Sequence, residues 1–462
     1  MSTLFGDPES AAAPLRGMQD LVAAFSSGEK PSARHGVGIE YERLPVHRET
    51  GQAIPYSAPA PSRGGPHATI ATFLSGMVAR GWTAQREGGP IVALEKGGTH
   101  VTLEPGAQVE LSGRVHSSVK DAAAELDAFV READEVASPL GIAFLGLGLQ
   151  PFTPADSIGW VPKRRYGIMA PYLASRGHLA HHMMKATAGC QINLDFSSEQ
   201  DAMEMLRVAT GVSTLVTAIC GNSPLEAGQA NGFVTKRSHV WMHTDPDRCG
   251  LLKFAFDPEA RYETYAGYAL DVPMMFVVRD GTWMEMKGMT FRRFMAGGSS
   301  GLVATRADWQ LHLTTLFPEV RLKSYLEVRG SDSGSQAMTL AQAALWKGLL
   351  YDRSSRAAAW ELVRKPAFEQ RLAFQRDVAR RGLGAALDGR PALDLARELL
   401  DAASRGLAAG EASFLEPMRR LVDADAASPT TRLMAQWAGP WQRRPWRLVE
   451  GLMAIDRSPG GG

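Results

Sequence analysis

Hydrophobic and polar residues alternate along several short segments of the chain, which is the pattern of half-buried β-strands. The alternation is strict in IEYE, within residues 36–46, and in QINLDF, within residues 190–196. Strands are also predicted for residues 143–152 (AFLGLGLQPF) and 323–330 (KSYLEVRG). Two further runs, IVALEK and THVTLEPG, are separated by two glycines, which indicates a hairpin. The chain is therefore expected to form a largely antiparallel sheet.

Hydrophobic residues at intervals of three and four predict helices over residues 15–25, 70–80, 117–138 and 199–220. A loop rich in Pro, Gly and Ser occupies residues 55–66. Beyond about residue 335 the pattern is helical, with many Ala, Leu and Arg residues. No strand is followed by a Gly-rich phosphate loop and a helix. These features predict an α+β fold with flanking helices and a helical C-terminal third.

Composition restricts the classes of function. Hydrophobic residues make up 45% of the 462 residues, and 50 Lys and Arg balance 49 Asp and Glu. A net charge this close to zero would not attract nucleic acid or an anionic membrane, so neither is an expected partner. Small-molecule substrates are expected instead. No run of about 18 apolar residues predicts a membrane span.

Cysteine usage and the N-terminal segment suggest a compartment. Cys190, Cys220 and Cys249 form no CxxC pair, which fits a reducing environment and predicts that no intramolecular disulfide controls activity. The first twenty residues lack a basic region followed by an apolar core, so a secretory signal is not expected. The protein is therefore predicted to be cytoplasmic.

Acidic and amide residues recur at even spacing on the predicted strands, so they share faces of the sheet. Such residues are Glu40 with Glu42, Gln191 with Asn193 and Asp195, and Glu327 with Arg329, while Glu104 and Glu110 flank a Pro-Gly turn. Each set alone is compatible with an ordinary solvated strand face. Several together are costly to bury unless cations lie between them, and carboxylates combined with substrate phosphates are what Mg²⁺ binds.

Basic residues lie beside aromatic ones in two turn-rich segments, KRRYG at 163–167 and KRSHVW at 236–241. The planar fork of arginine suits a carboxylate or a phosphate. A surface cluster of basic residues is the alternative interpretation. With the acid-rich strands, these segments indicate a site for an anionic substrate.

A series of short motifs makes the chain similar to the plant-type glutamate–cysteine ligases. The matching segments are DLVAAFSSGEKP, VGIEYERL, VTLEPGAQVELSG, IAFLGLGLQPF, PKRRYGIM, QINLDFSSE, NGFVTKRSHVW, TDPDR, YALDVPM, GMTFRRFM, HLTTLFPEVRLKSYLEVRG and LLYD. They keep the family order, and a weaker likeness continues to the C-terminus. The resemblance implies a glutamine synthetase-like fold with a cup-like active site. It suggests a catalytic core over residues 14–353 and a helical region over 354–462 packed on it.

The resemblance also implies an activity and its residues. The family uses ATP to join the γ-carboxylate of glutamate to the amine of cysteine through γ-glutamyl phosphate, the first step of glutathione synthesis. Two or more Mg²⁺ ions would be held by Glu40, Glu42, Glu104, Glu110, Gln191 and Glu327. Arg329, Arg165 and Asn193 would be catalytic residues near the phosphoryl groups. Arg237 would hold the α-carboxylate of glutamate, and Tyr166 and Trp241 would line the amino-acid pockets.

Two departures from the family pattern leave the acceptor open. Met242 and His243 stand where smaller or acidic groups are usual, and GSDSGSQ replaces a motif that usually carries glycines and a Trp. A γ-glutamyl ligase for another amine is therefore an alternative, and an inactive ligand-binding relative is a second. A monomer or a homodimer is expected.

Overall fold

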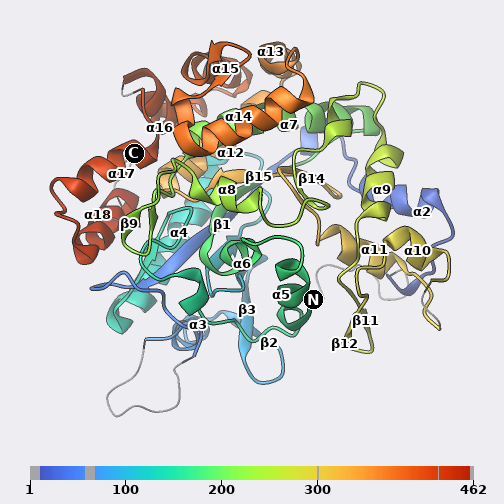
Figure 1. Cartoon of the computed structure of the whole chain (residues 1–462), viewed down its shortest axis with the longest axis horizontal. Coiled ribbons are helices and arrows are strands. Elements are labelled where there is room, and N and C mark those ends of the chain that lie inside the picture. Colours follow the sequence, from blue (N-terminus) through green and yellow to red (C-terminus); the bar gives the residue numbers. More distant parts are fainter. Residues whose placement is uncertain (1–10, 58–67, 299–300, 425, 458–462) are drawn as a thin grey trace.

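The computed structural model describes residues 11–57, 68–298, 301–424 and 426–457. Its centre is a nine-stranded antiparallel sheet (Figure 1). Eight strands lie in the order β14 (Val320–Leu322), β15 (Leu326–Asp332), β7 (Gly189–Leu194), β1 (Val37–His47), β5 (Val109–Ser112), β4 (Thr99–Leu103), β3 (Ile91–Lys96) and β2 (Thr83–Arg86). The ninth strand, β6 (Ile142–Leu145), pairs with the second half of β1. The predicted antiparallel sheet is confirmed.

Strand register places the polar residues of the central strands on one face. Glu42 lies opposite Glu110 of β5, and Glu40 lies opposite Gln191 of β7. Glu327 of β15 lies opposite Asn193. Because side chains alternate between the faces of a strand, the intervening residues, such as Ile39, Tyr41, Ile192 and Val328, point the other way and are buried.

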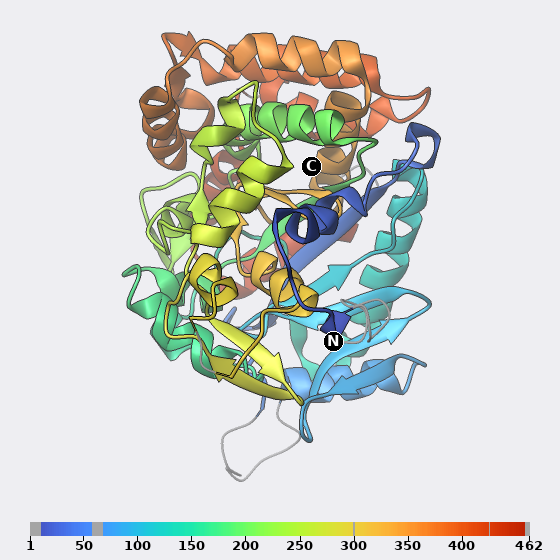
Figure 2. The same cartoon turned by 90° about the vertical axis from the view of Figure 1, so that its right-hand side faces the viewer.

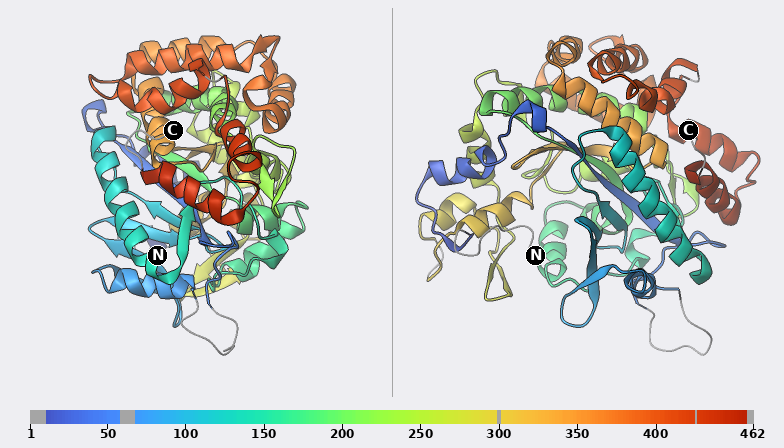
Figure 3. Two further views of the ribbon diagram at one scale, coloured as in Figure 1. Left: turned by 90° about the vertical axis from the view of Figure 1, so that its left-hand side faces the viewer. Right: turned by 180° about the vertical axis from the view of Figure 1, so that it is seen from behind.

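The apolar face of the sheet is covered by long helices. α4 (Val119–Ala137) lies across β1, and α12 (Gln336–Tyr351) contacts β1 and β7 (Figure 3). α7 (Glu199–Cys220) contacts β15. Each begins at a serine whose side chain accepts a hydrogen bond from the backbone three residues on, which satisfies a donor of the first turn. α7 is long and apolar enough to cross a membrane by composition, but most of it is buried inside the protein, as in a core helix.

The C-terminal third is helical, as predicted. Its helices between residues 336 and 406 gather at one end of the molecule, while the hairpin of β11 (Phe276–Arg279) and β12 (Thr282–Glu285) lies at the other (Figure 2). The last two helices lie along the side of the molecule, where the final one contacts β6. The helices of this third are α13 (Arg353–Val363), α14 (Phe368–Arg381), α15 (Ala392–Gly406), α16 (Glu416–Arg419), α17 (Pro429–Ala438) and α18 (Pro445–Arg457). The proposed boundary at residue 353 coincides with the start of α13, and the division into core and C-terminal region stays a prediction.

Shorter elements surround the polar face and the rim of the sheet. The helices are α2 (Met18–Ser26), α3 (Ile70–Val78), α5 (Tyr166–Ala174), α6 (Ala180–Ala186), α8 (Lys236–Trp241), α9 (Tyr262–Asp271), α10 (Phe291–Met295) and α11 (Arg306–Leu313). The two-stranded ribbons are β8 (Leu225–Glu226) with β9 (Gln229–Ala230), β10 (Cys249–Gly250) with β13 (Phe317–Pro318), β11 (Phe276–Arg279) with β12 (Thr282–Glu285), and β16 (Ala386–Leu387) with β17 (Arg390–Pro391).

Two predicted elements differ from the observed ones. The strand expected over 143–152 ends at Leu145, because the chain then passes close to other backbone: a Cβ on Gly146 would lie 1.9 Å from the carbonyl oxygen of Gly334. The strand expected over 323–330 begins only at Leu326, after the turn from β14. Most of the loop predicted at 55–66 lies outside the described residues.

All three cysteines carry free thiols, and reductants are expected to leave the reaction rate unchanged. Cys190 and Cys220 are buried, and burial raises the pKa of Cys190 and of Cys249 to about 12, so little reactive thiolate forms at neutral pH. The test compares initial rates after incubation with an oxidant or with a reductant. A several-fold difference that disappears in a Cys190→Ala variant would contradict this prediction.

Candidate active site

Four carboxylates converge on the polar face, from β1, β5 and the turn that precedes β5. Glu42 and Glu110 occupy directly opposite positions on β1 and β5, and Glu40 lies two residues earlier on β1. Glu104 begins the turn to β5, where its N–H donates to the carbonyl of Gln108 at 3.0 Å. The turn needs Gly106, because a Cβ there would lie 2.1 Å from the carbonyl oxygen of Lys185. The turn places Glu104 near the other acids, because its charge raises the pKa values of both Glu42 and Glu110.

Mutual repulsion in this cluster shows in its protonation. Burial, and then the charge of Glu104, raise the pKa of Glu42 to about 7. Burial, and then the charges of Glu40, Glu104 and Glu42, hold the pKa of Glu110 well above its ordinary value. Few donors offset the charge: Glu42 accepts from the Gly189 N–H and from Gln191 Nε2, and Glu110 accepts from the Thr102 hydroxyl. Arg237 and Arg329 offset part of the effect at Glu42, but burial and the neighbouring acids leave the pKa values of Glu42 and Glu110 raised.

On the other side of β7, Glu327 has the opposite surroundings. It is fully buried and paired with Arg321 at 2.6 Å, Arg329 at 2.9 Å and Lys323 at 3.1 Å. Although burial raises the pKa of Glu327, these three cations lower it well below the ordinary value. Three cations thus compensate the charge of Glu327, whereas the pKa values of Glu42 and Glu110 are raised.

Two amide side chains link the halves of the site. Gln191 donates to Glu42 at 2.9 Å, and its Oε1 accepts from Arg329 at 3.1 Å. Asn193 donates to Glu40 at 2.8 Å, while its Oδ1 is buried without a hydrogen-bond partner. A buried acceptor without a partner is unfavourable by about 1–3 kcal/mol, so Asn193 offers an oxygen to a ligand. Asp195, predicted on the same face, instead pairs with Lys30 at 2.8 Å and lies outside the cluster.

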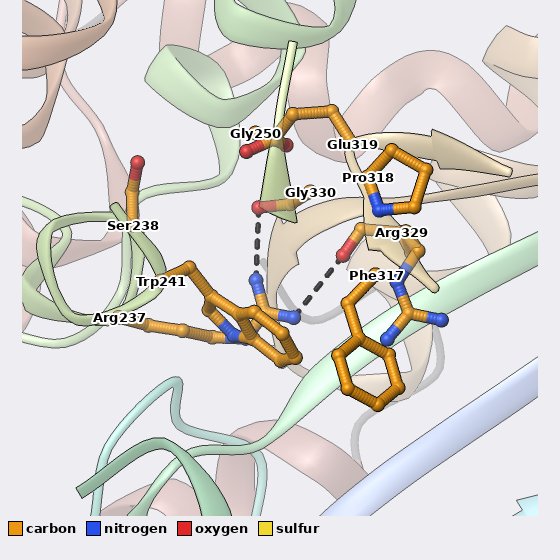
Figure 4. A pocket seen from close by; sticks show the side chains of 9 residues that line it. All are labelled: Arg237, Ser238, Trp241, Gly250, Phe317, Pro318, Glu319, Arg329 and Gly330. Carbon is orange, nitrogen blue, oxygen red and sulfur yellow. Dashed lines mark hydrogen bonds between the residues drawn. The ribbon is translucent and has the colours of Figure 1, made fainter. Parts of the chain in front are cut away.

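Arg237 lines a small pocket beside this cluster, with Trp241, Phe317, Glu319 and Arg329 (Figure 4). Its guanidinium donates to the carbonyls of Gly330 at 2.9 Å and Arg329 at 3.1 Å. Both arginines lie against the Trp241 ring, each with its guanidinium carbon 5.6 Å from the ring centroid. Arg237 Nε and Trp241 Nε1 are buried without partners. This pocket therefore presents two cations and unused donors, which suit a carboxylate.

The backbone around Arg237 is held by a buried polar network centred on Asp332. The carboxylate of Asp332 accepts from the hydroxyls of Ser223 at 2.7 Å and Thr235 at 2.8 Å. Ser223 accepts from the Arg237 N–H, and Thr235 caps the first turn of α8. Gly189 permits the approach of the arginine, since a Cβ there would lie 2.6 Å from Arg237 Nη2. Asp332 comes from the segment in which the chain departs from the family pattern.

Arg165 and Tyr166 approach the acids from α5. Arg165 donates to the Tyr166 hydroxyl at 3.2 Å, which in turn donates to the carbonyl of Leu103, next to Glu104. Arg165 Nε is buried without a partner. Burial, and then the charge of Arg165, lower the pKa of the neighbouring Lys163 to about 7. Tyr166 does not line the Arg237 pocket, and its predicted contact with an amino acid stays a prediction.

The chemistry of the four-acid cluster fits divalent metal. Carboxylate oxygens, together with the unused oxygen of Asn193, are the hard donors that Mg²⁺ prefers, and a cation would relieve the raised pKa values of Glu42 and Glu110. Within the described parts of the chain, no three His, Cys, Asp or Glu side chains lie close enough to hold an ion as they stand, so the carboxylates would reorient around it. Gln191 and Glu327 fit less directly, because arginines already occupy their oxygens.

Met242 and His243, the residues that suggest another acceptor, lie outside the Arg237 pocket. The His243 ring lies 4.3 Å from that of His239 and 5.2 Å from that of His178, measured between centroids. Its Nδ1 bonds the carbonyl of His239 at 2.8 Å. Neither residue lines the pocket with Arg237 and Trp241.

The sequence analysis missed three charged residues of the site, Glu319, Arg321 and Lys323. They lie between β13 and the turn into β15, inside one of the quoted motifs. Arg321 lies directly opposite Glu327 in the β14–β15 hairpin. The basic residues just before β15 were therefore the feature of the sequence that could have indicated partners for Glu327. Glu319 accepts a hydrogen bond from Gln375 at 2.8 Å. Burial raises the pKa of Glu319, although the charges of Arg237 and Arg329 act to lower it.

The fold is that of the glutamine synthetase-like carboxylate–amine ligases. A glutamate–cysteine ligase from Francisella tularensis, solved in complex with AMP, superposes with a TM-score of 0.55 at 13% identity over 92% of this chain and 90% of its own. A bifunctional glutathione synthetase from Pasteurella multocida gives 0.51 at 13% identity, over 94% of this chain and 53% of its own.

Sequence comparison identifies the family. The model of glutamate–cysteine ligase family 2 matches residues 36–447, and the chain belongs to that family. Glutamate–cysteine ligase B from Oryza sativa subsp. japonica is 37% identical over 432 residues, covering 92% of this chain and 85% of the relative. The Arabidopsis thaliana enzyme is 36% identical over 442 residues, covering 94% and 82%.

The comparison corrects one prediction. Both plant relatives are chloroplastic, which contradicts the cytoplasmic location expected for this chain. The prediction was wrong because the absence of an apolar N-terminal segment argues only against a secretory signal. Targeting segments for plastids are amphipathic and have no such apolar segment.

Proposed function

We propose that the protein joins the γ-carboxylate of glutamate to the amine of cysteine, using ATP and Mg²⁺, through γ-glutamyl phosphate. One observation carries the proposal. In a chain of the glutamate–cysteine ligase family, four carboxylates, two of them with raised pKa values, meet beside a pocket that holds two arginines. An acid cluster suits metal-bound phosphates, and the arginine pocket suits the amino-acid carboxylate next to them.

Each group has a proposed task. Arg237, with its unused Nε donor, binds the α-carboxylate of glutamate. Arg165 lies near Glu104 and Glu110, and Arg329 lies near Glu42. The two arginines stabilise negative charge on the transferred phosphoryl group and on the tetrahedral adduct formed by the amine. Asn193 and Gln191 hold Glu40 and Glu42 in place. The protein thus acts by positioning and by charge stabilisation, since the leaving phosphate supplies the driving force for amide formation.

Metal ions would be held by Glu40, Glu42, Glu104 and Glu110, with Asn193 beside them. Bound there, Mg²⁺ supplies positive charge against the polyphosphate and orients it. Glu327 and Gln191 remain predicted ligands for a further ion, which would take the place of the contacts they make with Arg329.

The proposal predicts metal-dependent ADP release that requires both glutamate and an amine. The assay follows ADP with ATP, Mg²⁺ and glutamate, adding cysteine or other amines singly, and identifies the product by mass spectrometry. Excess EDTA should abolish ADP release, and Mg²⁺ should restore it. Stimulation by cysteine with formation of γ-glutamylcysteine is the expected result. Stimulation only by another amine would reject cysteine as the acceptor, and no ADP release from a folded sample would reject the ligase activity.

A further inference from the structure

A second cavity, of about 120 Å³, lies away from the acids, between α12 and the last two helices of the described chain. Met338 and Gln342 of α12 form one wall, and Leu433 of α17 and Leu452 of α18 form the other. Leu421 closes one side of it. The carboxylate cluster and Arg237 do not line this cavity.

The walls of this cavity are mostly apolar, with one unused polar group. Gln342 is 1% exposed, and its Nε2 has no hydrogen-bond partner. Since residues 338 and 342 lie one turn apart on α12, the amide and the Met338 side chain face the same space. The other buried polar groups of the lining are occupied: Asn222 donates to the carbonyls of Gly146 and Ser333, and Asp332 accepts from three donors.

Water is a poor occupant of such a space. A buried water is held by about three hydrogen bonds. Arg432, Gln436 and Asp456 also line the cavity on the side of α17 and α18, but most of the lining surface is apolar. Apolar cavities of about 150 Å³ in other proteins stay dry and accept benzene. The volume here therefore matches a compact ring or a branched aliphatic group. An acceptor on that ligand would also give Gln342 Nε2 the hydrogen bond that it lacks, and a buried donor without a partner is unfavourable.

We propose that this cavity is a binding site for a small, largely apolar molecule that carries one hydrogen-bond acceptor. The apolar part lies among Met338, Leu421, Leu433 and Leu452, and the acceptor receives the hydrogen bond of Gln342 Nε2. The site is spatially separate from the ligase site, because none of the residues that bind the ligand belongs to the acid cluster or the Arg237 pocket. Asp332, which holds the backbone of Arg237 through Ser223 and Thr235, nevertheless also lines the cavity.

The test uses phenol and toluene, two rings of similar size of which only phenol carries an oxygen acceptor. Titration calorimetry on the full-length protein should give saturable 1:1 binding of both, with phenol the tighter. Gln342→Met keeps the side-chain volume and removes the donor. It should weaken the binding of phenol by about tenfold, which corresponds to one hydrogen bond, and leave the affinity for toluene unchanged. Leu433→Phe should fill the space and abolish binding of both.

Gln200→Met, an exposed substitution on α7, is the matched control and should bind like the wild type. Thermal melting checks that each variant is folded. Failure of both compounds to saturate the wild-type protein would overturn the proposal. So would binding that survives in folded Leu433→Phe, or a phenol affinity that Gln342→Met leaves unchanged. Because binding is measured directly, these outcomes are separate from any result on ligase activity.

Discussion

Glu110→Gln is expected to abolish turnover and, without divalent metal, to raise the melting temperature. The glutamine oxygen can still accept from the Thr102 hydroxyl, while the variant removes one charge from a cluster with Glu40, Glu42 and Glu104. Like charges in direct cross-strand contact destabilise a sheet. The same charge is needed for metal, so activity and stability should change in opposite directions.

The stability difference should depend on pH. The pKa of Glu110 in the folded protein lies well above its ordinary value of 4.5, so folding favours the protonated form. The contribution of Glu110 to wild-type stability is therefore lost as pH rises above 4.5, and the glutamine variant lacks this loss, while Glu42 titrates in both proteins. In EDTA, the melting temperatures of the wild type and of Glu110→Gln should agree near pH 4.5, and that of the variant should become the higher towards pH 8. A near-normal turnover rate would remove Glu110 from the metal site.

Glu327→Gln is the matched comparison, because it changes a carboxylate on the same face of the sheet in opposite surroundings. It should also lose activity, but it leaves Arg321, Lys323 and Arg329 without their shared counter-charge. Removing one partner from a buried ion pair costs about 3–5 kcal/mol, so its melting temperature should fall. Equal melting temperatures for the two variants would contradict the distinction between the two acids.

The second large effect is expected for Arg237→Ala, which should raise the KM for glutamate about 100-fold and leave the KM for ATP nearly unchanged. The variant removes the forked donor that is proposed to hold the α-carboxylate, a contact of about 3 kcal/mol. Steady-state kinetics with each substrate varied in turn provides the measurement. The guanidinium also donates to the Gly330 and Arg329 carbonyls, so thermal melting must accompany the kinetics.

Arg207→Ala supplies the control for Arg237→Ala. The Arg207 guanidinium also lies over a tryptophan, with its carbon 5.5 Å from the Trp360 ring centroid, and Arg207 does not line the pocket. It should leave both KM values unchanged. Arg237→Lys should have a KM for glutamate between those of the wild type and Arg237→Ala, because lysine keeps the positive charge and loses the forked pair of donors. An equal rise in the KM for ATP and for glutamate would argue against a role of Arg237 in glutamate recognition.

The parts of the site that follow from local chain geometry could be predicted from the sequence. Glu40 and Glu42 share a face because a strand repeats every two residues, and IEYE shows this without any tertiary information. The same argument correctly put Gln191 and Asn193 together. It failed for Asp195, which lies just past the end of β7 and pairs with Lys30.

The parts that depend on register could not be predicted in this way. That Glu42 opposes Glu110 depends on how β1 and β5 align, and the compensation of Glu327 depends on its pairing with Arg321 of β14. The length of the strand at 143–152 was overestimated because its apolar pattern continues through Gly146, where backbone packing forces the chain away. Tertiary contacts decided each of these points.

The strand order also has a consequence for the rate at which the chain folds. Gln191, which bridges Glu42 and Arg329, lies 149 residues from the first and 138 from the second. Pairings this distant require closure of long loops before they gain any stabilising contact, and such sheets form slowly. During synthesis, Gln191 of β7 has no arginine partner until β15, which carries Arg329, has left the ribosome. In refolding experiments, the ability to bind glutamate should therefore return after most of the helical signal.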